Sequence, residues 1–352
     1  MQLVISSLIA LLAFPIAYIA CALTKHTGVV DAPDGKRKQQ AAPIPRLGGV
    51  GIAVAIGLVT GGLALAHSIL PELMNGGDWF PGPVALVVIA LAASLLLFGI
   101  GVCDDVFGMS AQVKLVLVTM VCLAAPLLGV SAGALETPFG DVTAPAVMIA
   151  GSALWLIVFT NAANFMDGSN GLSLGSMAIM LAGLGAAHMT AADVQFPIGL
   201  MAIIAALIGF LVHNMRGTLY AGDCGAFGVG GLFATLALVS NLPVWTIATL
   251  ALPFLIDVLM TLVLRGRNGN AWFEAHTDHA YQVLRHTGSS HWDVALIWWG
   301  LSLTCAIGAV IAVSGGGALP FIVFWVMAVS LSFCWIVVQR QARDQLTRER
   351  NG

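Results

Sequence analysis

Two adjacent carboxylates, Asp104 and Asp105, stand where one long apolar run ends and another begins. Acidic side chains at the C-terminal end of a helix oppose the helix dipole, which favours cations at that end. A divalent cation would compensate the pair, and neighbouring carboxylates also raise each other's pKa, which suits proton transfer. Taken alone, the pair fits a solvated helix end equally well.

A second polar segment carries Asn or Asp at every third residue, at Asn161, Asn164, Asp167 and Asn170, together with two glycines. At a membrane boundary, four such side chains with glycine hinges favour a cradle for a metal ion and a polar ligand over a chance polar loop. Carboxylate and amide oxygens are suitable ligands for Mg²⁺.

A third motif, Gly222-Asp223-Cys-Gly225, places an acid between glycines where a helix is expected to begin. Glycines let the backbone approach a ligand closely, and a helix N-terminus favours phosphate. An aspartate that merely caps the helix explains the motif equally well.

Cationic and acidic residues also surround a later polar segment. The stretch from Phe273 to Gln282 holds His276 and His279 but lacks the regular spacing of a zinc-binding helix. Beside Arg265 and Arg267, the two histidines suit an anionic pyrophosphate better. Asp257 precedes them, about two turns inside an apolar run. An acid within a membrane span is costly and by default functional, but pairing with a neighbouring cationic or hydroxyl group is an equal alternative here.

The composition requires these groups to be held by membrane helices. Apolar residues make up 59% of the 352 positions and charged residues 9%, with a mean hydropathy of +0.95, whereas soluble domains carry about 25% charge. Runs of roughly 20 apolar residues match the bilayer core and predict an all-α polytopic membrane protein with about 11 transmembrane helices. We place them at 3–23, 47–70, 83–102, 113–131, 143–161, 171–189, 196–214, 224–241, 243–264, 293–314 and 318–338.

The distribution of charge predicts the orientation. All 14 Lys and Arg residues fall in alternate loops, which the positive-inside rule assigns to the cytoplasm, with the N-terminus outside and the C-terminus cytoplasmic. Nearly all the polar motifs then share the cytoplasmic side. We therefore expect a single integral-membrane domain over residues 1–352. Its cytoplasmic segments are expected at about 24–46, 103–112, 162–170, 215–223 and 265–292, with a tail at 339–352.

Acids for Mg²⁺, cations for phosphates, glycine-rich turns and a membrane surface together predict phosphoryl transfer between a soluble diphosphate and a lipid. An anion transporter is the alternative from another class. Transporters hold their substrate near the membrane midplane, and only Asp257 favours that alternative.

In this order, the motifs resemble those of the polyprenyl-phosphate N-acetylhexosamine-1-phosphate transferases through nearly the whole chain. Pro43-Ile-Pro-Arg-Leu-Gly-Gly49 looks like the end of the family's first cytoplasmic loop, and Lys114 follows the acidic pair by nine residues, as in the family. Asn170 departs from the more common Asp, and Ala226 from a usual serine. The last loop lacks the triple histidine of phospho-MurNAc-pentapeptide transferases, which remain an alternative, and looks like the branch that initiates O-antigen and related surface polysaccharides.

The resemblance implies transfer of an N-acetylated sugar-1-phosphate from a UDP-sugar, GlcNAc or a 6-deoxy N-acetylhexosamine, to undecaprenyl phosphate with release of UMP. It further implies Mg²⁺, with Mn²⁺ as a substitute, and a bacterial inner membrane with the site facing the cytoplasm. Membrane lipid is an expected partner and nucleic acid is not; a homodimer is left open. The resemblance implies a catalytic role for Asp104, Asp105 and Lys114 and metal binding for Asn164 and Asp223. It implies nucleotide and sugar-phosphate binding for Asn161, Asp167, Asn170, Arg265, Arg267, His276 and His279. Support of the lipid phosphate or of the loop is implied for Lys36, Arg37 and Arg46.

Overall fold

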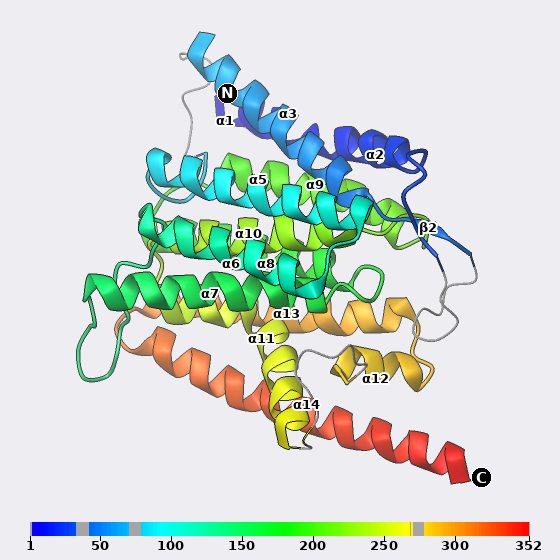
Figure 1. The fold of residues 1–352 in the computed structure, drawn as a ribbon. Helices are drawn as coiled ribbons and strands as arrows, with labels where there is room; N and C mark the ends of the chain where they lie inside the picture. The colour runs from blue at the N-terminus through cyan, green and yellow to red at the C-terminus, as the bar shows by residue number, and fades with distance from the viewer. Residues whose placement is uncertain (1, 33–41, 70–78, 268, 270–277, 352) are drawn as a thin grey trace.

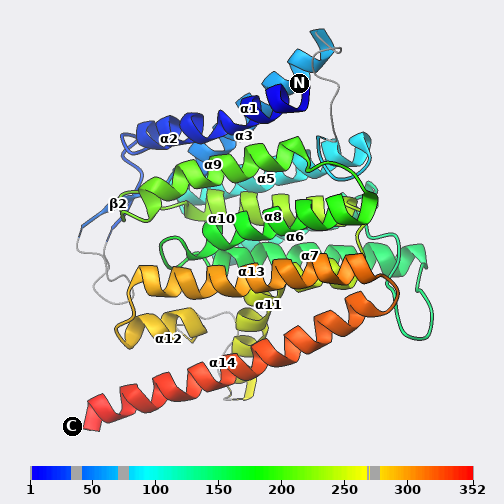
Figure 2. The same ribbon diagram turned by 180° about the vertical axis from the view of Figure 1, so that it is seen from behind.

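The computed structural model describes residues 2–32, 42–69, 79–267, 269 and 278–351. These residues form a bundle of long apolar helices whose chain ends lie at opposite ends of the bundle (Figures 1 and 2). The helices are α1 Gln2–Leu11, α2 Ala13–Thr24, α3 Gly48–Ile69, α5 Val84–Phe107, α6 Ala111–Leu127, α7 Pro145–Phe165, α8 Leu172–Ala192, α9 Ile198–Asn214, α10 Gly222–Val239, α11 Val244–Arg267, α12 Ala280–His286, α13 His291–Gly315 and α14 Leu319–Asn351. The strands are β1 Val30–Asp31 and β2 Ile44–Pro45.

Each predicted apolar run coincides with one helix, except the first, which spans α1 and α2. Within the described residues, nine helical segments are long and apolar enough to cross a membrane, with α1 and α2 together counting as one span. The two further apolar helices, α6 and α9, have 17 residues each. The prediction of an all-helical multi-pass membrane protein is confirmed, while the assignment of its two sides stays a prediction.

Helix α10 lies at the centre of the bundle and is buried along most of its length. It packs against α3, α5, α7 and α8. Its glycines allow this close packing: a methyl group added at Gly228 would lie 2.2 Å from the Phe98 ring of α5, and one at Gly231 2.2 Å from the Leu97 side chain. α5 and α10 are thereby held at a fixed spacing, which matters because both carry acidic residues of the site.

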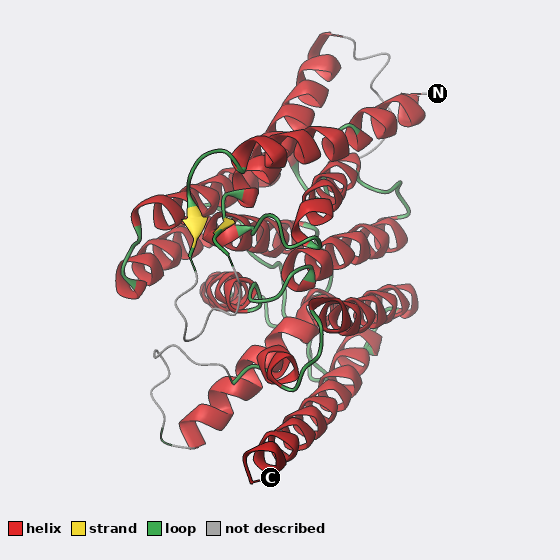
Figure 3. Cartoon of the chain, turned by 90° about the vertical axis from the view of Figure 1, so that its right-hand side faces the viewer, coloured by secondary structure: helices red, strands yellow, loops and turns green. Residues whose placement is uncertain are grey.

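The segment that joins β2 to α3 is docked on the residues that precede α10. β1 and β2 pair antiparallel, with Val30 opposite Pro45. Tyr220 N–H donates to the Pro45 carbonyl at 2.8 Å, and Gly48 N–H donates to the Tyr220 carbonyl at 2.9 Å. These backbone bonds bring Arg46 to the start of α10. Figure 3 looks onto this end of the bundle, where the two strands and several connecting loops lie.

Helix α11 runs at a steep angle to its neighbours in its later part, as Figures 1 and 2 show. It contains Pro253, whose ring cannot be accommodated in an undistorted helix interior. The short helix α12 packs beside α13 and α14. This arrangement brings α12 to the same end of the bundle as the C-terminus of α5 and the N-terminus of α10.

Candidate active site

A polar cavity of about 720 Å³ opens at this end of the bundle. It lies where α5, α7 and α9 end and where α6, α8, α10 and α13 begin. Its lining consists of Asp31, Ile44, Arg46, Asp104, Lys114, Asn164, Asp167, Gly168, Ser169, Asn170, Asn214, Gly217, Tyr220, Ala221, Gly222, Asp223, Tyr281, Gln282, Arg285, His286 and His291. The acidic pair, the Asn/Asp segment and the Gly-Asp-Cys-Gly motif, far apart in the sequence, therefore meet at one place.

Lys114 joins the acids of α5 and α10. Its ammonium group donates to Asp104 Oδ2 at 2.9 Å and also to Asp223 Oδ2. The other carboxylate oxygen of Asp223 accepts from Asn164 Nδ2 at 3.1 Å. α5 is capped by Gly108, which has a φ of +69°, a conformation that glycine adopts without the penalty of a Cβ. The turn that follows lets α6 begin close enough for Lys114 to reach back to α5.

The two adjacent acids have different surroundings. Asp104 lines the cavity, whereas the side chain of Asp105 is fully covered. Asp105 accepts from Arg46 Nε at 2.8 Å, and also from the backbone N–H groups of Asp223 and Cys224 at 3.1 and 3.0 Å. Successive residues of a helix point about 100° apart, so the side chains of the two adjacent acids meet different partners. Asp105 therefore ties Arg46 to the N-terminus of α10, where unpaired N–H groups favour a carboxylate.

The predicted end of the third span at residue 102 is too early, because α5 continues to Phe107. Both acids consequently lie within the last turns of a helix and are buried, at 8% and 6% exposure for Asp104 and Asp105. The cationic and N–H partners described above satisfy carboxylates that a helix C-terminus would otherwise disfavour.

The polar segment after α7 folds into a tight loop held from two sides. Gly171, with a φ of +78°, donates its N–H to Asn214 Oδ1 at 2.6 Å. On the other side, Asn170 N–H donates to His291 Nδ1 at 3.2 Å, and the Ser169 hydroxyl lies 2.9 Å from the same nitrogen. These bonds place Asp167 and Asn170 in the wall of the cavity.

Asp167 is an acid with acidic neighbours. Its position deep within the protein, and then the charges of Asp223 and Asp105, raise its pKa well above the usual range. The side chain nevertheless keeps access to the cavity, since it lines the wall and is only partly covered. The crowding of carboxyl groups that raises this pKa would be relieved by a bound cation, which makes the cavity attractive to one.

The donor set fits a magnesium ion. The floor of the cavity brings together the carboxylates of Asp104, Asp167 and Asp223 and the amide of Asn164, and Mg²⁺ prefers such oxygen ligands. Among the described residues, no three His, Cys, Asp or Glu side chains form a ready-made metal cluster. A magnesium ion usually takes one or two carboxylates from the protein and completes its shell with substrate phosphates and water.

Several predicted site residues lie outside the cavity lining. Asn161 donates to the Ile157 carbonyl of its own helix at 2.7 Å. Arg265 is buried and pairs with Asp278 at 2.6 Å, and His279 is buried at the start of α12. Arg267 is exposed at the end of α11. The predicted residues Lys36, Arg37 and His276 lie outside the described part of the chain.

The cavity also holds residues that sequence reasoning missed. Gln282, Arg285 and His286 reach it from α12, and His291 from the start of α13. α12 has only seven residues, which is too short for a helical period to be recognised. The nearest signal is the segment that follows His279, where Gln282, Arg285 and His286 alternate with apolar residues.

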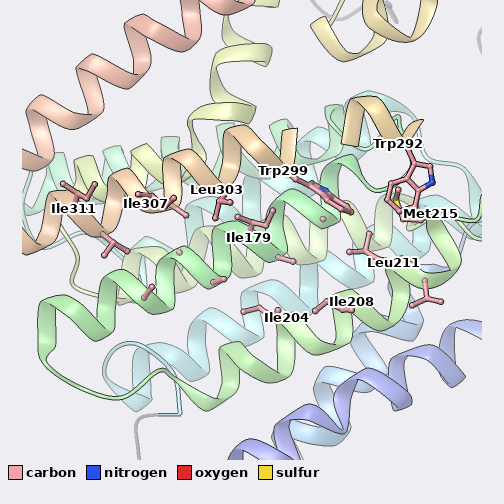
Figure 4. A pocket seen from close by; sticks show the side chains of 18 of the residues that line it. Ile179, Ile204, Ile208, Leu211, Met215, Trp292, Trp299, Leu303, Ile307 and Ile311 are labelled. Carbon is pink, nitrogen blue, oxygen red and sulfur yellow. The ribbon is translucent and has the colours of Figure 1, made fainter. Parts of the chain in front are cut away.

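A second cavity, of about 950 Å³, is an apolar groove between α8, α9 and α13 (Figure 4). Ile179, Ile208, Leu211 and Ile307 are among its lining residues. Among the described residues its lining includes the cation Arg216 but no acidic side chain, so it offers no carboxylate for a metal ion or for proton transfer. The polar cavity is therefore the candidate active site.

Comparisons with known proteins agree with this site. The profile of glycosyl transferase family 4 matches residues 87–241, which include the acidic pair, the Asn/Asp loop and the Gly-Asp-Cys-Gly motif. The chain is 30% identical over 332 residues to decaprenyl-phosphate N-acetylglucosaminephosphotransferase of Mycobacterium tuberculosis, covering 84% of this chain and 80% of that protein.

Two further relatives carry different names. A probable undecaprenyl-phosphate N-acetylglucosaminyl 1-phosphate transferase of Bacillus subtilis is 24% identical over 316 residues, covering 86% of this chain and 82% of the relative. A phospho-N-acetylmuramoyl-pentapeptide-transferase of Synechococcus is 29% identical over 255 residues, covering 67% and 66% of the two chains. The profile match, the extent of these likenesses and the conjunction of the motifs in one cavity together show that the chain belongs to glycosyl transferase family 4, the polyprenyl-phosphate N-acetylhexosamine-1-phosphate transferases.

Proposed function

We propose that this membrane enzyme transfers an N-acetylhexosamine-1-phosphate from a UDP-sugar to undecaprenyl phosphate and releases UMP. Membership of the family carries the reaction class, a sugar-1-phosphate transfer to a polyprenyl phosphate. The observation that supports it best is the contact of Lys114 with both Asp104 and Asp223 at the wall of a polar cavity. A cavity at the end of membrane helices suits one substrate that arrives from the bilayer and another that arrives from water.

In the proposed step, a phosphate oxygen of the lipid attacks the β-phosphorus of the UDP-sugar. The bond between that phosphorus and the bridging oxygen breaks, and the bridging oxygen leaves with UMP. Asp104, the member of the acidic pair that lines the cavity, orients the attacking phosphate and takes its proton if one is present. Lys114 neutralises phosphate charge at the same point. Catalysis is thus mainly positioning and charge stabilisation.

Asp105 has a different part in this proposal. Its oxygens already accept from Arg46 and from two N–H groups of α10, so it holds the start of α10 and the backbone of Asp223 in place. We assign it a positioning role and assign the chemical role to Asp104.

Asp223 and Asn164 are the residues that would hold Mg²⁺, with Mn²⁺ as a substitute, and Asp167 is close enough to add its charge. When bound, the ion would polarise the donor pyrophosphate and offset charge on the departing UMP. Arg285 and His286 of α12 line the same cavity and are suited to bind the donor's phosphates. They take the place that sequence analysis gave to Arg265 and His279.

For the donor we propose UDP-GlcNAc or a 6-deoxy N-acetylhexosamine nucleotide, in the first membrane step of O-antigen or another surface polysaccharide. The names of the relatives from Mycobacterium tuberculosis and Bacillus subtilis both contain N-acetylglucosamine. The name of the Synechococcus relative favours a peptidoglycan precursor instead. The positive-inside rule supports a site that faces the cytoplasm, and the bacterial relatives support a bacterial inner membrane.

The test is UMP release by the purified protein in detergent, with undecaprenyl phosphate, Mg²⁺ and a panel of UDP-N-acetyl sugars that includes UDP-MurNAc-pentapeptide. We expect UMP only when the lipid, the metal and one donor are all present, and chelation by EDTA should abolish it reversibly. Asp104→Asn and Asp223→Asn should remove the activity. Asp141→Asn changes an exposed acid that precedes the N-terminus of α7, the end of that helix opposite Asn164, and serves as the matched control. A folded protein that releases no UMP with any donor would refute the proposal.

A further inference from the structure

Asp257 is a buried carboxylate that the proposed reaction does not use. It lies in α11, four residues after Pro253, with 2% exposure, and it does not line the polar cavity. Burial of a carboxylate within a membrane protein is costly unless hydrogen bonds or charges compensate it. Its partners should therefore show what it is for.

Those partners belong to the start of α12 and to α14. Asp257 Oδ1 accepts from the backbone N–H of Ala280 and from Trp335 Nε1, both at 2.8 Å. Asp257 Oδ2 lies 3.8 Å from His279 Nδ1. One carboxylate in the middle of α11 thus joins the first residues of α12 to the C-terminal helix of the chain.

A second set of contacts fixes the residue just before α12. Gln339 of α14 donates from Nε2 to the Asp278 carbonyl at 2.7 Å. Arg265 of α11 donates to the Asp278 carboxylate at 2.6 Å. α11 and α14 therefore hold residues 278–280 from two directions, and α12 lies beside α14 in both views of the bundle (Figures 1 and 2).

The position of α12 matters for the cavity. The Tyr281 hydroxyl donates to the Phe165 carbonyl at 2.9 Å and lies against Gly168 of the Asn/Asp loop. One turn further, Arg285 and His286 line the cavity. A helix of seven residues has little stability of its own, because nucleation is unfavourable and few bonds follow it. Its placement must come from the residues that anchor it.

We propose that Asp257 is a positioning residue that, together with Trp335 and Gln339 of α14, anchors α12 so that its cationic face meets the donor. This inference rests on the proposed function, since it assigns α12 to the UDP-sugar side of the site. Asp257 touches neither substrate in this view and acts through Ala280. A purely structural role would instead stabilise the packing of α11 on α14 without affecting one substrate more than the other.

The experiment measures kcat, the KM for UDP-GlcNAc (or the active donor) and the KM for undecaprenyl phosphate separately. Asp257→Ala removes all the anchor contacts of the carboxylate and should raise the donor KM about tenfold or more, as expected for loss of buried hydrogen bonds. The KM for the lipid should stay within about twofold, since α12 carries no proposed lipid contact. Asp257→Asn keeps an oxygen that can accept from Ala280 N–H, so its donor KM should lie between those of Asp257→Ala and the wild type.

Trp335→Phe is a second, milder variant for the case that Asp257→Ala does not fold. It removes one donor to Asp257 and should raise the donor KM about two- to tenfold. Trp325→Phe makes the same change on the same helix, at an exposed position packed near Trp245 and Phe321, and should leave both KM values unchanged. UMP binding measured by calorimetry should weaken in the Asp257 and Trp335 variants and not in Trp325→Phe.

The outcomes separate the two proposals. An inactive wild-type protein that also fails to bind UMP would refute the proposed function. An active wild-type protein whose Asp257 and Trp335 variants melt earlier but show unchanged KM values, or an equal rise in both, would refute the positioning role alone.

Discussion

The unequal surroundings of the two adjacent acids predict opposite phenotypes for the same substitution. Asp105→Asn should destabilise the protein, whereas Asp104→Asn should leave it stable but inactive. The side chain of Asp105 is fully covered, and its two oxygens accept from Arg46, Asp223 N–H and Cys224 N–H. An asparagine in either orientation would turn its own N–H group toward one of these donors.

The magnitude follows from these contacts. A buried donor left without an acceptor costs about 1–3 kcal/mol, and removal of one partner from a buried ion pair costs about 3–5 kcal/mol. The Arg46 side chain is 25% exposed, so water recovers part of its interaction, and we expect a loss near the low end, about 3 kcal/mol. For a chain of 352 residues, with an unfolding entropy of about 2.1 cal/mol/K per residue, that corresponds to a melting temperature lowered by about 4 °C.

Asp104→Asn should cost less. The amide oxygen of an asparagine can still accept from Met109 N–H, which donates to Asp104 Oδ1 at 2.8 Å, and Lys114 keeps its contact with Asp223. The amide N–H group would then face the Lys114 ammonium, which is 23% exposed and can turn to water, so we expect a loss of about 1–2 kcal/mol, together with loss of UMP release. Thermal melting in detergent and the UMP assay, run on both variants, check this. Equal melting temperatures for the two variants, or an active Asp104→Asn enzyme, would show that the assignment of roles is wrong.

Three further predictions concern the same cavity. Because the pKa of Asp167 is raised, the folded state binds more protons than the unfolded state between the ordinary and the raised pKa, so stability should fall as pH rises through that window. Asp167→Asn should flatten this dependence of the melting temperature on pH, measured without metal from pH 5 to 8. Parallel curves for the variant and the wild type would contradict the prediction. Lys114→Gln leaves Asp104 and Asp223 without their shared cation, so it should melt earlier without metal and gain more from added Mg²⁺ than the wild type; an equal gain counts against a metal site here. A methyl group at Gly168 would lie 2.2 Å from the Tyr281 hydroxyl, so Gly168→Ala should raise the donor KM. Gly168→Ala combined with Tyr281→Phe should bring the donor KM part of the way back to the wild-type value. A double variant with no such recovery would exclude this clash as the cause.

The fold could be predicted because membrane helices are recognised from composition alone. The runs that became α3 and α8, for example, lie within one or two residues of their predicted bounds at 47–70 and 171–189, apart from the last turn of α8. The end of α5 could not be predicted in this way. Hydropathy falls at Asp104 and Asp105, but the helix continues because partners from α6, α10 and the segment before α3 compensate the two charges.

The candidate site was predicted in part for a related reason. The predicted topology puts the motifs that carry Asp104, Asp167 and Asp223 on one side of the membrane, and in the structure all three side chains line one cavity. Arg265 and His279 show the limit of such reasoning. The sequence alone does not distinguish a buried cation that pairs with an acid from a cation that binds phosphate, and the structure adds the contacts of Arg265 with Asp278 and of His279 with Asp257.

The close approach of three helices explains why one carboxylate can organise so much of the site. A methyl group at Gly101 of α5 would lie 2.4 Å from the backbone of Cys224, and one at Gly49 of α3 would lie 2.2 Å from Gly225 N. Only glycine allows backbones to come this near. Because α5 and α10 touch at Gly101, Asp105, one turn further along α5, is within hydrogen-bond distance of the first amides of α10. The glycines of these motifs therefore contribute by setting the distance between helices, and the position of Asp223 in the cavity is a consequence of that packing.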